Sequence, residues 1–265
     1  MSTAFLIAVD IGNARIKLGL FATPRTSSLP EPVRTLSLAG DLLELDQIAP
    51  WLDESLDKPY SWWVASVNRL ATTRLTDWIR KHLPEHRITL FTADNLPLTV
   101  QLELPDMVGI DRLINAVAVN CLREANRPAV IVDVGTAITV DLVSADGAFQ
   151  GGAILPGLQM SAQALHEFTD LLPLVDMSDL AAPPPALGKA TVSAIQSGLF
   201  WGAVGSIRLL IEQLTVGIAF KPQVFLTGGV SATVARLLGP DVQHVPNLTL
   251  SGVAVTALQY DKQET

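Results

Sequence analysis

The sequence predicts an α/β protein made of two related halves, and two observations support this prediction. Short apolar runs of strand length alternate with amphipathic stretches of helix length along the chain. In addition, residues 9–19 and residues 132–141 read almost alike. Each has an apolar strand that ends in Asp, then any residue, then Gly and a short polar turn into a second strand. We therefore expect one half in residues 1–126 and the other in residues 127–265.

The composition is that of a globular chain with a substantial core. Hydrophobic residues make up 49% of the 265 residues and charged residues 17%, which excludes a disordered or fibrous protein. The net charge of −8 argues against broad nucleic-acid binding. No secretory signal and no run of ~20 apolar residues is visible, so we expect a cytoplasmic protein whose partners include no nucleic acid and no membrane. The single cysteine, Cys121, is expected to be a small buried hydrophobe.

The first half begins with an apolar run and an alternating run joined by a polar turn. Gly12 and Asn13 both tolerate a positive φ and therefore predict a tight turn. Strands are expected at residues 4–9, 15–20, 33–38, 61–67 and 88–91. Helical spacing covers residues 42–56, 71–83 and 113–125, with an interruption at Pro50. Asp111 stands where the N-cap of the last helix is expected.

The second half repeats this alternation. Strands are expected at residues 129–132, in the hairpin that follows, in the glycine-rich stretch 151–157 and at 224–226. Helices are expected at residues 158–168, at 191–214, from Ser231 onward and at 250–260. Residues 23–32, 94–110 and 169–190 are expected to be loops, because they are rich in Pro, Gly and polar residues. The small residues within 191–214 are typical of a helix in a close-packed interface.

The first hairpin combines groups that suit a phosphate ligand. Asp10 ends a buried strand, where a carboxylate is costly unless it is paired or bound to a metal. Gly12 allows a ligand to approach the backbone closely, and the N–H groups of a turn can point at phosphate oxygens. Lys17 shares a strand face with Arg15 and is placed to meet the same phosphates. For a lone hairpin, an Asp that caps its own turn would be the simpler explanation.

The second hairpin changes that judgement, because two such hairpins in matching places predict a shared ligand. Asp133 and Asp141 flank Thr136 and Thr139, and oxygen ligands of this kind suit Mg²⁺, K⁺ or phosphate-bound water. The alternative is a hairpin rich in Thr for its strand propensity, and both interpretations stay open for Asp141 and Thr139. The pair of hairpins predicts a phosphoryl-transfer enzyme that holds ATP between them.

A third group of residues lies between the two hairpins. Arg112 would lie in the first turn of its helix, where a cation opposes the helix dipole. This placement indicates an anionic partner, such as a substrate carboxylate bound in the fork of the guanidinium. Asp111 can accept the proton of an attacking hydroxyl, and phosphoryl transfer demands little of its base. A cap role for Asp111 is the alternative.

Other patterns exclude common classes of kinase and dehydrogenase. The chain has neither a P-loop pattern nor Gly-x-Gly-x-x-Gly, which disfavours a P-loop kinase and a dinucleotide-binding dehydrogenase. Its four histidines show no metal-ligand spacing. Gly228 and Gly229 follow a strand, and both a simple turn and a close approach to adenine explain them.

At these residues the chain resembles the type III pantothenate kinases, a family of the acetate kinase, sugar kinase and actin superfamily. The matching segments occur in the order of that family at residues 10–13, 109–112, 133–137, 151–157, 188–191 and 194–198. The resemblance implies a duplicated RNase H-like (actin-like ATPase) fold, with mixed sheets flanked by helices. It also implies transfer of the ATP γ-phosphate to pantothenate, giving 4′-phosphopantothenate in the first step of coenzyme A biosynthesis.

The resemblance further implies a role for individual residues and a homodimer with the substrate site at its interface. The first hairpin would hold the ATP phosphates, with Mg²⁺ at Asp10, through Asp10, Ile11, Gly12, Asn13, Ala14, Arg15, Ile16 and Lys17. Thr136 would bind ATP, and Asp133 would hold a monovalent cation, K⁺ or NH₄⁺. Pantothenate would be bound by Gly109, Ile110, Asp111 and Arg112, with Asp111 as the catalytic proton acceptor. Thr191 would reach pantothenate across the dimer.

Two positions depart from the family pattern. Ala14 stands where a Thr or Ser is usual, which removes one hydroxyl that binds phosphate. Leu102 stands where the family often has Tyr, which removes one substrate hydrogen bond. Two alternatives remain: a catalytically silent relative with a regulatory role, and a superfamily kinase for another small hydroxy acid. Retention of the charged residues Asp10, Asp111, Arg112 and Asp133, together with Thr191, argues against the silent relative.

Overall fold

The computed structural model describes residues 5–22, 29–39, 42–52, 60–178, 180 and 182–263, which form two compact units. The first unit takes its described residues from Met1–Thr99, Glu103–Leu122 and Asn247–Thr265. The second unit takes its described residues from Val100–Leu102 and Arg123–Pro246. The division expected after residue 126 lies close to Arg123, where the chain passes from the first unit to the second. The last segment of the chain, however, groups with the first unit.

A five-stranded mixed sheet with the order β3-β2-β1-β4-β5 forms the centre of the first unit. Its strands are β1 (Phe5–Ile11), β2 (Arg15–Ala22), β3 (Arg34–Ala39), β4 (Ser61–Ser66) and β5 (Arg87–Leu90). The pairs β1–β2 and β2–β3 are antiparallel, whereas β1–β4 and β4–β5 are parallel. The hairpin that carries Asp10 therefore lies at the centre of the sheet and not at an edge.

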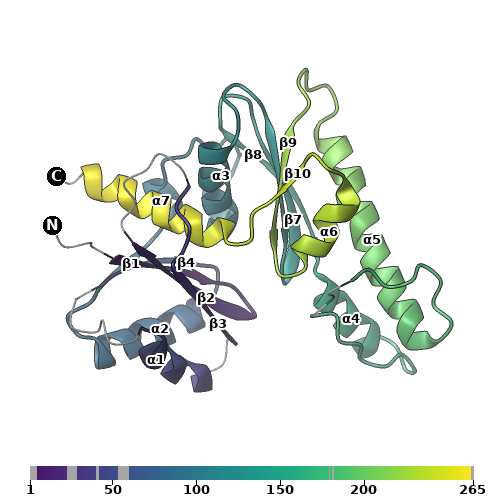
Figure 1. Ribbon diagram of the computed structural model, residues 1–265, viewed down its shortest axis with the longest axis horizontal. Helices are drawn as coiled ribbons and strands as arrows, with labels where there is room; N and C mark the ends of the chain where they lie inside the picture. The colour runs from purple at the N-terminus through teal and green to yellow at the C-terminus, as the bar shows by residue number, and fades with distance from the viewer. Residues whose placement is uncertain are drawn as a thin grey trace. The chain divides into compact units, whose positions relative to one another are not determined.

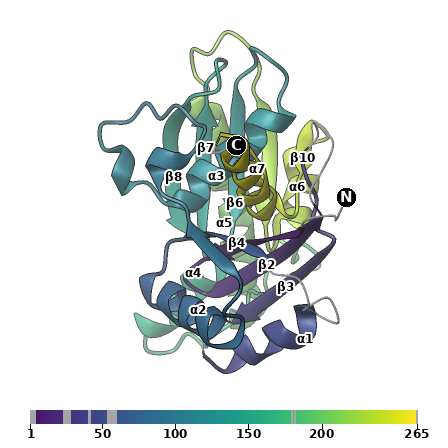
Figure 2. The ribbon, with the colours of Figure 1, turned by 90° about the vertical axis from the view of Figure 1, so that its left-hand side faces the viewer.

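Helices cover both faces of this sheet. They are η1 (Leu42–Gln47), α1 (Ile48–Leu52), α2 (Arg69–His82), η3 (Ala93–Asn95), η4 (Pro105–Met107), α3 (Ile110–Leu122) and α7 (Leu248–Gln263). α1 and α2 lie on one face and α3 and α7 on the other (Figures 1 and 2). Under α1 and α2, the apolar side chains of Ile7, Trp62 and Leu75 are fully buried in one core.

The last helix, α7, packs closely on α3. A Cβ atom at Gly252 would lie 2.5 Å from the carbonyl oxygen of Ile114, so only glycine permits this approach. The Thr249 hydroxyl donates to Asn115 Oδ1 at 2.9 Å, and both side chains are buried. The C-terminal helix is thus an integral part of the first unit.

The second unit repeats the topology of the first. Its strands are β6 (Ala129–Val134), β7 (Ala137–Val143), β8 (Phe149–Pro156), β9 (Gln223–Gly228) and β10 (Val242–His244), in the order β10-β9-β6-β7-β8. The pairs β6–β7 and β7–β8 are antiparallel, and β6–β9 and β9–β10 are parallel. In both units the first strand pairs with the second and the fourth in the same sense, which confirms the expected duplication.

Three helices pack on one face of the second sheet: α4 (Leu158–Glu167), α5 (Thr191–Leu214) and α6 (Ser231–Leu238) (Figure 1). Their core includes Val132, Val140 and Leu226 of the strands with Phe200 of α5 and Val234 of α6. α5 has the length and composition of a helix that can cross a membrane, and 28% of its most apolar window is buried.

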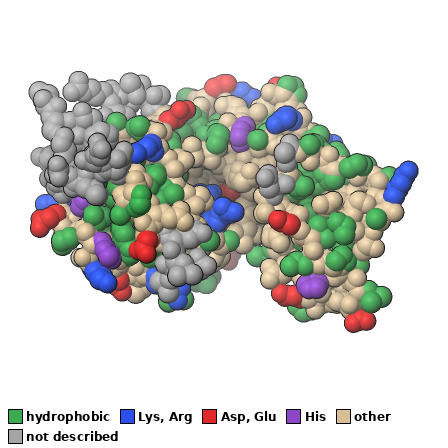
Figure 3. Space-filling model, turned by 60° about the horizontal axis from the view of Figure 1, so that its bottom comes forward, with side chains coloured by type: hydrophobic (Ala, Val, Ile, Leu, Met, Phe, Trp, Pro, Cys, Tyr) green, Lys and Arg blue, Asp and Glu red, His purple; other side chains and the backbone are tan. Residues whose placement is uncertain are grey.

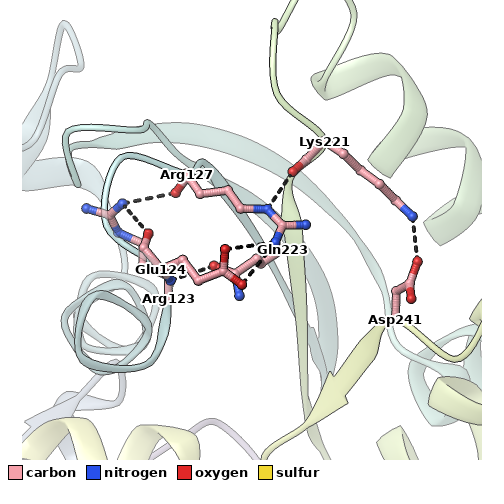
Figure 4. A network of polar contacts seen from close by, with 6 residues as sticks. All are labelled: Arg123, Glu124, Arg127, Lys221, Gln223 and Asp241. Atoms are coloured by element: carbon pink, nitrogen blue, oxygen red, sulfur yellow. Dashed lines mark hydrogen bonds and ion pairs between the residues drawn. The ribbon is translucent and has the colours of Figure 1, made fainter.

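A polar network ties together the chain segments at the start of the second unit (Figure 4). Gln223 Oε1 accepts a hydrogen bond from the backbone N–H of Glu124 at 2.6 Å. Arg127 donates through Nε to the carbonyl oxygen of Lys221 at 2.9 Å and pairs with the Glu124 carboxylate at 3.1 Å. Arg123 donates to the carbonyl oxygens of Arg127 and Ala145. These contacts anchor the segment that follows α3 to the end of the second sheet at which β9 begins.

Most expected elements are present with small shifts at their ends, and the differences have local causes. α3 begins at Ile110, so Asp111 lies in the first turn and not at the N-cap. Pro50 lies in the first turn of α1, where a residue needs no N–H donor. The break in the expected helix 42–56 comes earlier, between η1 and α1, before Ile48. The short strand β10 was not expected, because three residues give too brief a pattern. Residues 4, 23–28, 53–56, 179 and 181 of the expected elements lie outside the described part of the chain.

The expected turn at Gly12 and Asn13 is present between β1 and β2, although neither residue uses a positive φ there; among the described residues Asn126 is the only non-glycine that does. One further expectation was wrong. Cys121 is exposed and not buried, since it lies near the end of α3 where the helix leaves the core.

Candidate functional site

Asp10 and Lys17 face each other across the first hairpin. They are directly opposite in the antiparallel register of β1 and β2, which places their side chains on one face of the sheet. Lys17 Nζ lies 4.0 Å from Asp10 Oδ2, and the Asp10 side chain is only 13% exposed. The lysine charge therefore offsets part of the cost of holding a carboxylate at the end of a buried strand.

The turn between these strands is open to solvent. The Gly12 N–H donates to the carbonyl oxygen of Arg15 at 3.0 Å, which closes a loop around Asn13 and Ala14. Asn13, Ala14 and Arg15 are all exposed and thus accessible to a ligand. Ile11 and Ile16 are buried, so any contact that they make with a ligand is limited to their backbone.

The start of α3 folds a carboxylate back over its own first turn. Asp111 Oδ1 accepts a hydrogen bond from the Arg112 N–H at 2.9 Å, and the Gly109 carbonyl oxygen accepts from the same N–H at 3.1 Å. A Cβ atom at residue 109 would lie 2.5 Å from Asp111 Oδ1, too close for any contact without a shift. Gly109 therefore creates the space that the Asp111 carboxylate occupies.

The same segment lies beside the end of β1. The Val67 N–H donates to the Ile11 carbonyl oxygen at 3.0 Å, and Val67 Cγ1 lies 3.5 Å from the Cβ position of Gly109. Because Ile11 follows Asp10 directly, this chain of contacts brings the start of α3 to the strand end that carries Asp10. The first unit thus gathers Asp10, Lys17 and Asp111 in one region.

Burial raises the pKa of the Asp111 carboxyl above its ordinary value. The Arg112 backbone N–H, the Arg112 charge and the Lys17 charge act in the opposite direction, with the burial effect larger than theirs. Lys17 therefore acts electrostatically on Asp111 as well as on Asp10. A carboxylate with a raised pKa is a better proton acceptor than an ordinary one, as a general base requires.

In the second unit, the Asp133 carboxylate is bordered by two glycines. A Cβ atom added at Gly135 would lie 3.5 Å from Asp133 Oδ1, and one added at Gly228 would lie 2.7 Å from it. Gly228 is the last residue of β9 and pairs with Val134. Gly228 has a φ of 103°, a conformation that strains any other residue. Only glycine at residue 228 leaves room for this carboxylate.

Thr139 lies directly opposite Asp133 in the antiparallel pair of β6 and β7. Its hydroxyl oxygen Oγ1 is buried and has no hydrogen-bond partner among the described residues. A buried hydroxyl without a partner is unfavourable and uncommon in folded proteins. The second hairpin therefore holds a carboxylate and an unsatisfied oxygen on the same face of the sheet.

Thr136 forms the tip of the second turn, which is one residue shorter than the first. The Gly135 N–H donates to the Ala137 carbonyl oxygen at 3.0 Å, so that Thr136 alone is enclosed. The Thr136 carbonyl oxygen accepts from the Gly157 N–H at 3.0 Å, whereas its side chain is exposed. The hydroxyl is therefore accessible to a ligand at this turn.

Thr191 lies in a pocket of about 710 Å³ within the second unit. Thr191 is the first residue of α5, and Lys189 is nearby in the same lining. Leu165 and Leu172 form an apolar wall, and neither Asp133 nor Thr136 belongs to the lining. The pocket thus combines an apolar surface with a hydroxyl and a cation.

Among the described residues, no group of three or more His, Cys, Asp or Glu side chains is arranged to hold a metal ion. A metal at Asp10 or Asp133 would need further ligands from backbone, hydroxyl groups or a bound substrate. This fits Mg²⁺ at Asp10, because Mg²⁺ is commonly held by one or two carboxylates plus substrate phosphates.

The structure thus divides the residues singled out from the sequence between the two units. The first unit holds Asp10 to Lys17 and Gly109 to Arg112, and the second holds Asp133, Thr136 and Thr191. Sequence reasoning does not single out Lys189, although its place in the matching segment 188–191 is a signal for it. The sequence does not decide the role of Thr139, because a hydroxyl without a partner is visible only in three dimensions.

Comparison with known proteins identifies relatives over nearly the whole chain. Residues 6–213 match the family model described as type III pantothenate kinase. A type III pantothenate kinase of Moorella thermoacetica is 33% identical over 258 residues, which cover 94% of this chain and 97% of the relative. One of Dehalococcoides mccartyi is 32% identical and covers 94% of this chain and 96% of the relative.

Solved structures resemble the fold at low sequence identity. An activator of a 2-hydroxyisocaproyl-CoA dehydratase from Clostridium difficile, solved with ADPNP, matches with a TM-score of 0.52 and 13% identity over 98% of each chain. A reductive activator for a corrinoid, iron–sulfur protein matches with a TM-score of 0.54 and 11% identity over 99% of this chain and 62% of that one. These likenesses support the duplicated fold alone.

Proposed function

The chain belongs to the type III pantothenate kinase family, and from this premise we propose that it transfers the γ-phosphate of ATP to the terminal hydroxyl of pantothenate. The products are 4′-phosphopantothenate and ADP. The match to the family over most of the chain supports the type of reaction. The observation that carries the mechanism is the gathering of Asp10, Lys17 and Asp111 in one unit.

Asp111 acts as the proton acceptor in this proposal. The pantothenate hydroxyl oxygen forms a bond to the γ-phosphorus while the bond from that phosphorus to the β-phosphate oxygen breaks. The hydroxyl proton passes to the Asp111 carboxylate, whose pKa is raised by burial. Arg112, next in the chain, binds the substrate carboxylate through its planar guanidinium.

The first hairpin holds the ATP phosphates. Lys17 supplies a positive charge, and the exposed turn at Asn13 and Ala14 offers backbone N–H groups as donors. Asp10 would hold Mg²⁺, which neutralises charge on the phosphates when it is bound with ATP. Because Ala14 has no hydroxyl, the donors at this turn are N–H groups and the Asn13 amide.

Asp133 would hold a monovalent cation, K⁺ or NH₄⁺, and Thr136 would bind ATP from the second turn. Support for the cation comes from the Asp133 carboxylate, which is bordered by glycines where the described residues form no group of three or more His, Cys, Asp or Glu side chains. The Thr136 side chain is exposed at the tip of its turn, as contact with ATP requires.

We also propose that the protein is a homodimer in which α5 packs on a second copy. Exposed residues form one stripe along α5 at helical spacing: Thr191, Ala194, Gly198, Gly202, Gly205 and Leu209. Nothing lies within 4 Å of the Cβ positions of the three glycines, so another helix can approach closely. Thr191 begins this stripe, which supports a substrate site completed across the dimer.

Exposed apolar side chains extend beyond this stripe. Figure 3 shows hydrophobic side chains over the part of the second unit where α4 and α5 lie. Phe168 and Leu171 are 84% and 85% exposed, which is unusual for large apolar side chains in an isolated domain. A second copy would cover such a surface. The expected cytoplasmic location stays a prediction, and a membrane is the alternative occupant of α5.

The kinase proposal is tested by a product assay. The protein is incubated with ATP, Mg²⁺, KCl and pantothenate, and 4′-phosphopantothenate is measured by mass spectrometry. No product from a protein whose circular dichroism shows an intact fold would overturn the proposal. Product with another small hydroxy acid but not with pantothenate would support the superfamily-kinase alternative, and ATP binding without turnover would support the silent relative.

The dimer is tested by light scattering after gel filtration. Gly202→Leu places a bulky side chain in the middle of the stripe and should convert the dimer to a monomer. Lys81→Leu, which adds an apolar side chain on the exposed face of α2, serves as the control and should remain dimeric. A monomeric wild-type protein, or one that partitions onto lipid vesicles instead, would overturn the dimer.

A further inference from the structure

Three neighbouring strands of the second sheet carry a row of oxygen atoms. Asp133 on β6 pairs with Thr139 on β7 in antiparallel register and with Thr227 on β9 in parallel register. Paired residues on adjacent strands stand on the same face of a sheet, so the three side chains line up across it. Val132, Val140 and Leu226, one residue away on each strand, point into the apolar core on the other face.

The two hydroxyl groups that flank Asp133 are used differently. Thr227 is 2% exposed, and its hydroxyl donates to the carbonyl oxygen of Pro246 at 3.4 Å. The Thr139 hydroxyl oxygen is buried without a partner among the described residues. Strand propensity alone does not explain a Thr at residue 139, because Val has the same shape and would leave no buried hydroxyl unsatisfied.

From this juxtaposition we infer that Thr139 is a further ligand of the monovalent cation and would contribute its hydroxyl oxygen Oγ1. The inference rests on the proposed cation at Asp133. A carboxylate beside the hydroxyl repels a phosphate oxygen and attracts a cation, so the lone pairs of Oγ1 are the useful groups. K⁺ is commonly bound by neutral oxygens that replace its hydration shell.

Two glycines border the Asp133 carboxylate. Neither Gly228 nor Gly135 projects a side chain onto Asp133 Oδ1, and the φ of 103° at Gly228 disfavours any residue with a Cβ atom at that position. The carboxylate of the buried Asp141 stands two residues beyond Thr139 on the same face of β7, and the described residues form no group of three or more His, Cys, Asp or Glu side chains. The Asp133 carboxylate with the neutral hydroxyl of Thr139 opposite it supplies oxygen ligands of the kind that K⁺ accepts.

The test uses thermal unfolding as a readout that is independent of turnover. Midpoints are measured against KCl concentration for the whole protein with a non-hydrolysable ATP analogue, at an ionic strength held constant with choline chloride. The inference predicts that Thr139→Val raises the half-saturating K⁺ concentration roughly tenfold. Thr139→Ser, which retains a hydroxyl, should restore most of the K⁺ affinity, and Thr89→Val on β5 serves as the matched control.

Without added K⁺, Thr139→Val should unfold at the same temperature as the wild type or at a higher one, because it removes an unsatisfied buried hydroxyl. An unchanged half-saturating K⁺ concentration would overturn the inference and leave the cation at Asp133 in place. A less stable variant without K⁺ would overturn it too, since the hydroxyl would then have a partner within the fold. If the unfolding midpoint of the wild type did not change with K⁺, both the proposed cation at Asp133 and the role of Thr139 as its ligand would be overturned. Formation of 4′-phosphopantothenate would still support the proposed kinase activity.

Discussion

The two hairpins have the same topology but opposite electrostatic designs. In the first, Asp10 faces Lys17 at 4.0 Å, so a protein cation lies across from the carboxylate. In the second, Asp133 faces Thr139, whose buried hydroxyl has no partner among the described residues. Duplication therefore preserved the position of the carboxylate while the residue opposite it diverged. The first hairpin suits anionic phosphates, and the second suits a cation.

The neighbours of the two carboxylates differ as well. Next to the first hairpin, α3 contributes Asp111, and the Lys17 charge acts on it. Next to the second hairpin, Gly228 lies so close to Asp133 that a Cβ atom there would be 2.7 Å from Asp133 Oδ1. The comparison teaches that a repeated fold supplies equivalent strand ends, whereas the residues that reach those ends from other elements set their chemistry.

The largest expected effect separates the roles of Asp111 and Asp133. Asp111→Asn should lower kcat by about 10²–10⁴-fold, because the proton acceptor is lost, while ATP binding stays within a few-fold of the wild type. Steady-state kinetics and calorimetric titration with an ATP analogue measure the two quantities. Asp106→Asn, an exposed carboxylate in the preceding loop, is the control. Near-normal turnover of Asp111→Asn would reduce Asp111 to a structural role at the start of α3.

The second prediction concerns the residue opposite Asp10. Lys17→Met should raise the KM for ATP by roughly 10–100-fold, the range that corresponds to loss of a hydrogen bond to a charged group. Lys81→Met on α2 should leave this constant unchanged. If Lys17→Met lowered K⁺ affinity and left the KM for ATP unchanged, the assignment of phosphates to the first hairpin would be reversed.

The third prediction contrasts two glycines that lie near the two carboxylates, Gly228 at the end of β9 and Gly12 in the turn after β1. Gly228→Ala should reduce the free energy of unfolding by about 1–3 kcal/mol, because its φ is 103° and a Cβ would lie 2.4 Å from the Val134 carbonyl oxygen. Gly12→Ala should cost much less, since its φ is not positive and its Cβ position is 3.4 Å from the nearest atom. Chemical denaturation measures both, and equal losses would contradict the difference.

The smallest effect is a pH dependence of stability. The folded-state pKa of Asp111 is raised above its ordinary value of 3.8, so its contribution to stability is full below that value and is lost as the pH rises through the folded-state pKa. At neutral pH the wild type therefore carries a buried charge that Asp111→Asn removes. The variant should melt roughly 2 °C higher at pH 7, with the difference shrinking toward pH 4. A difference that grows on acidification would contradict the raised pKa.

The same pKa predicts the acid limb of activity. The rate should fall as the pH drops through the Asp111 pKa, at a higher pH than an ordinary carboxyl would give. Stability and activity thus respond to Asp111 in opposite directions, as is common for a buried catalytic carboxylate.

Local patterns were enough to predict most elements of both sheets. Residues 15–20 alternate apolar and polar side chains, and they form the core of β2 with Ile16 and Leu18 buried. Residues 191–214 carry continuous helical spacing and form α5 with the same ends. The prediction failed where a feature depends on distant contacts. The position of Asp111 before an apolar helix predicts an N-cap, but α3 begins at Ile110, two residues earlier than that cap would place it, and the Asp111 carboxylate occupies the space beside Gly109.

The sequence by itself determined the duplication, the two Asp-x-Gly hairpins and the family, because strand alternation and turn composition are local and the motifs recur in order. Tertiary structure alone decided which residue stands opposite each carboxylate. The length of each turn sets the register of its two strands, and the register determines which residues are paired. It also decided that α7 returns to the first unit, where Gly252 permits its close approach to α3. The unsatisfied Thr139 hydroxyl belongs to this second class, because a missing hydrogen bond exists only once every neighbour has its place.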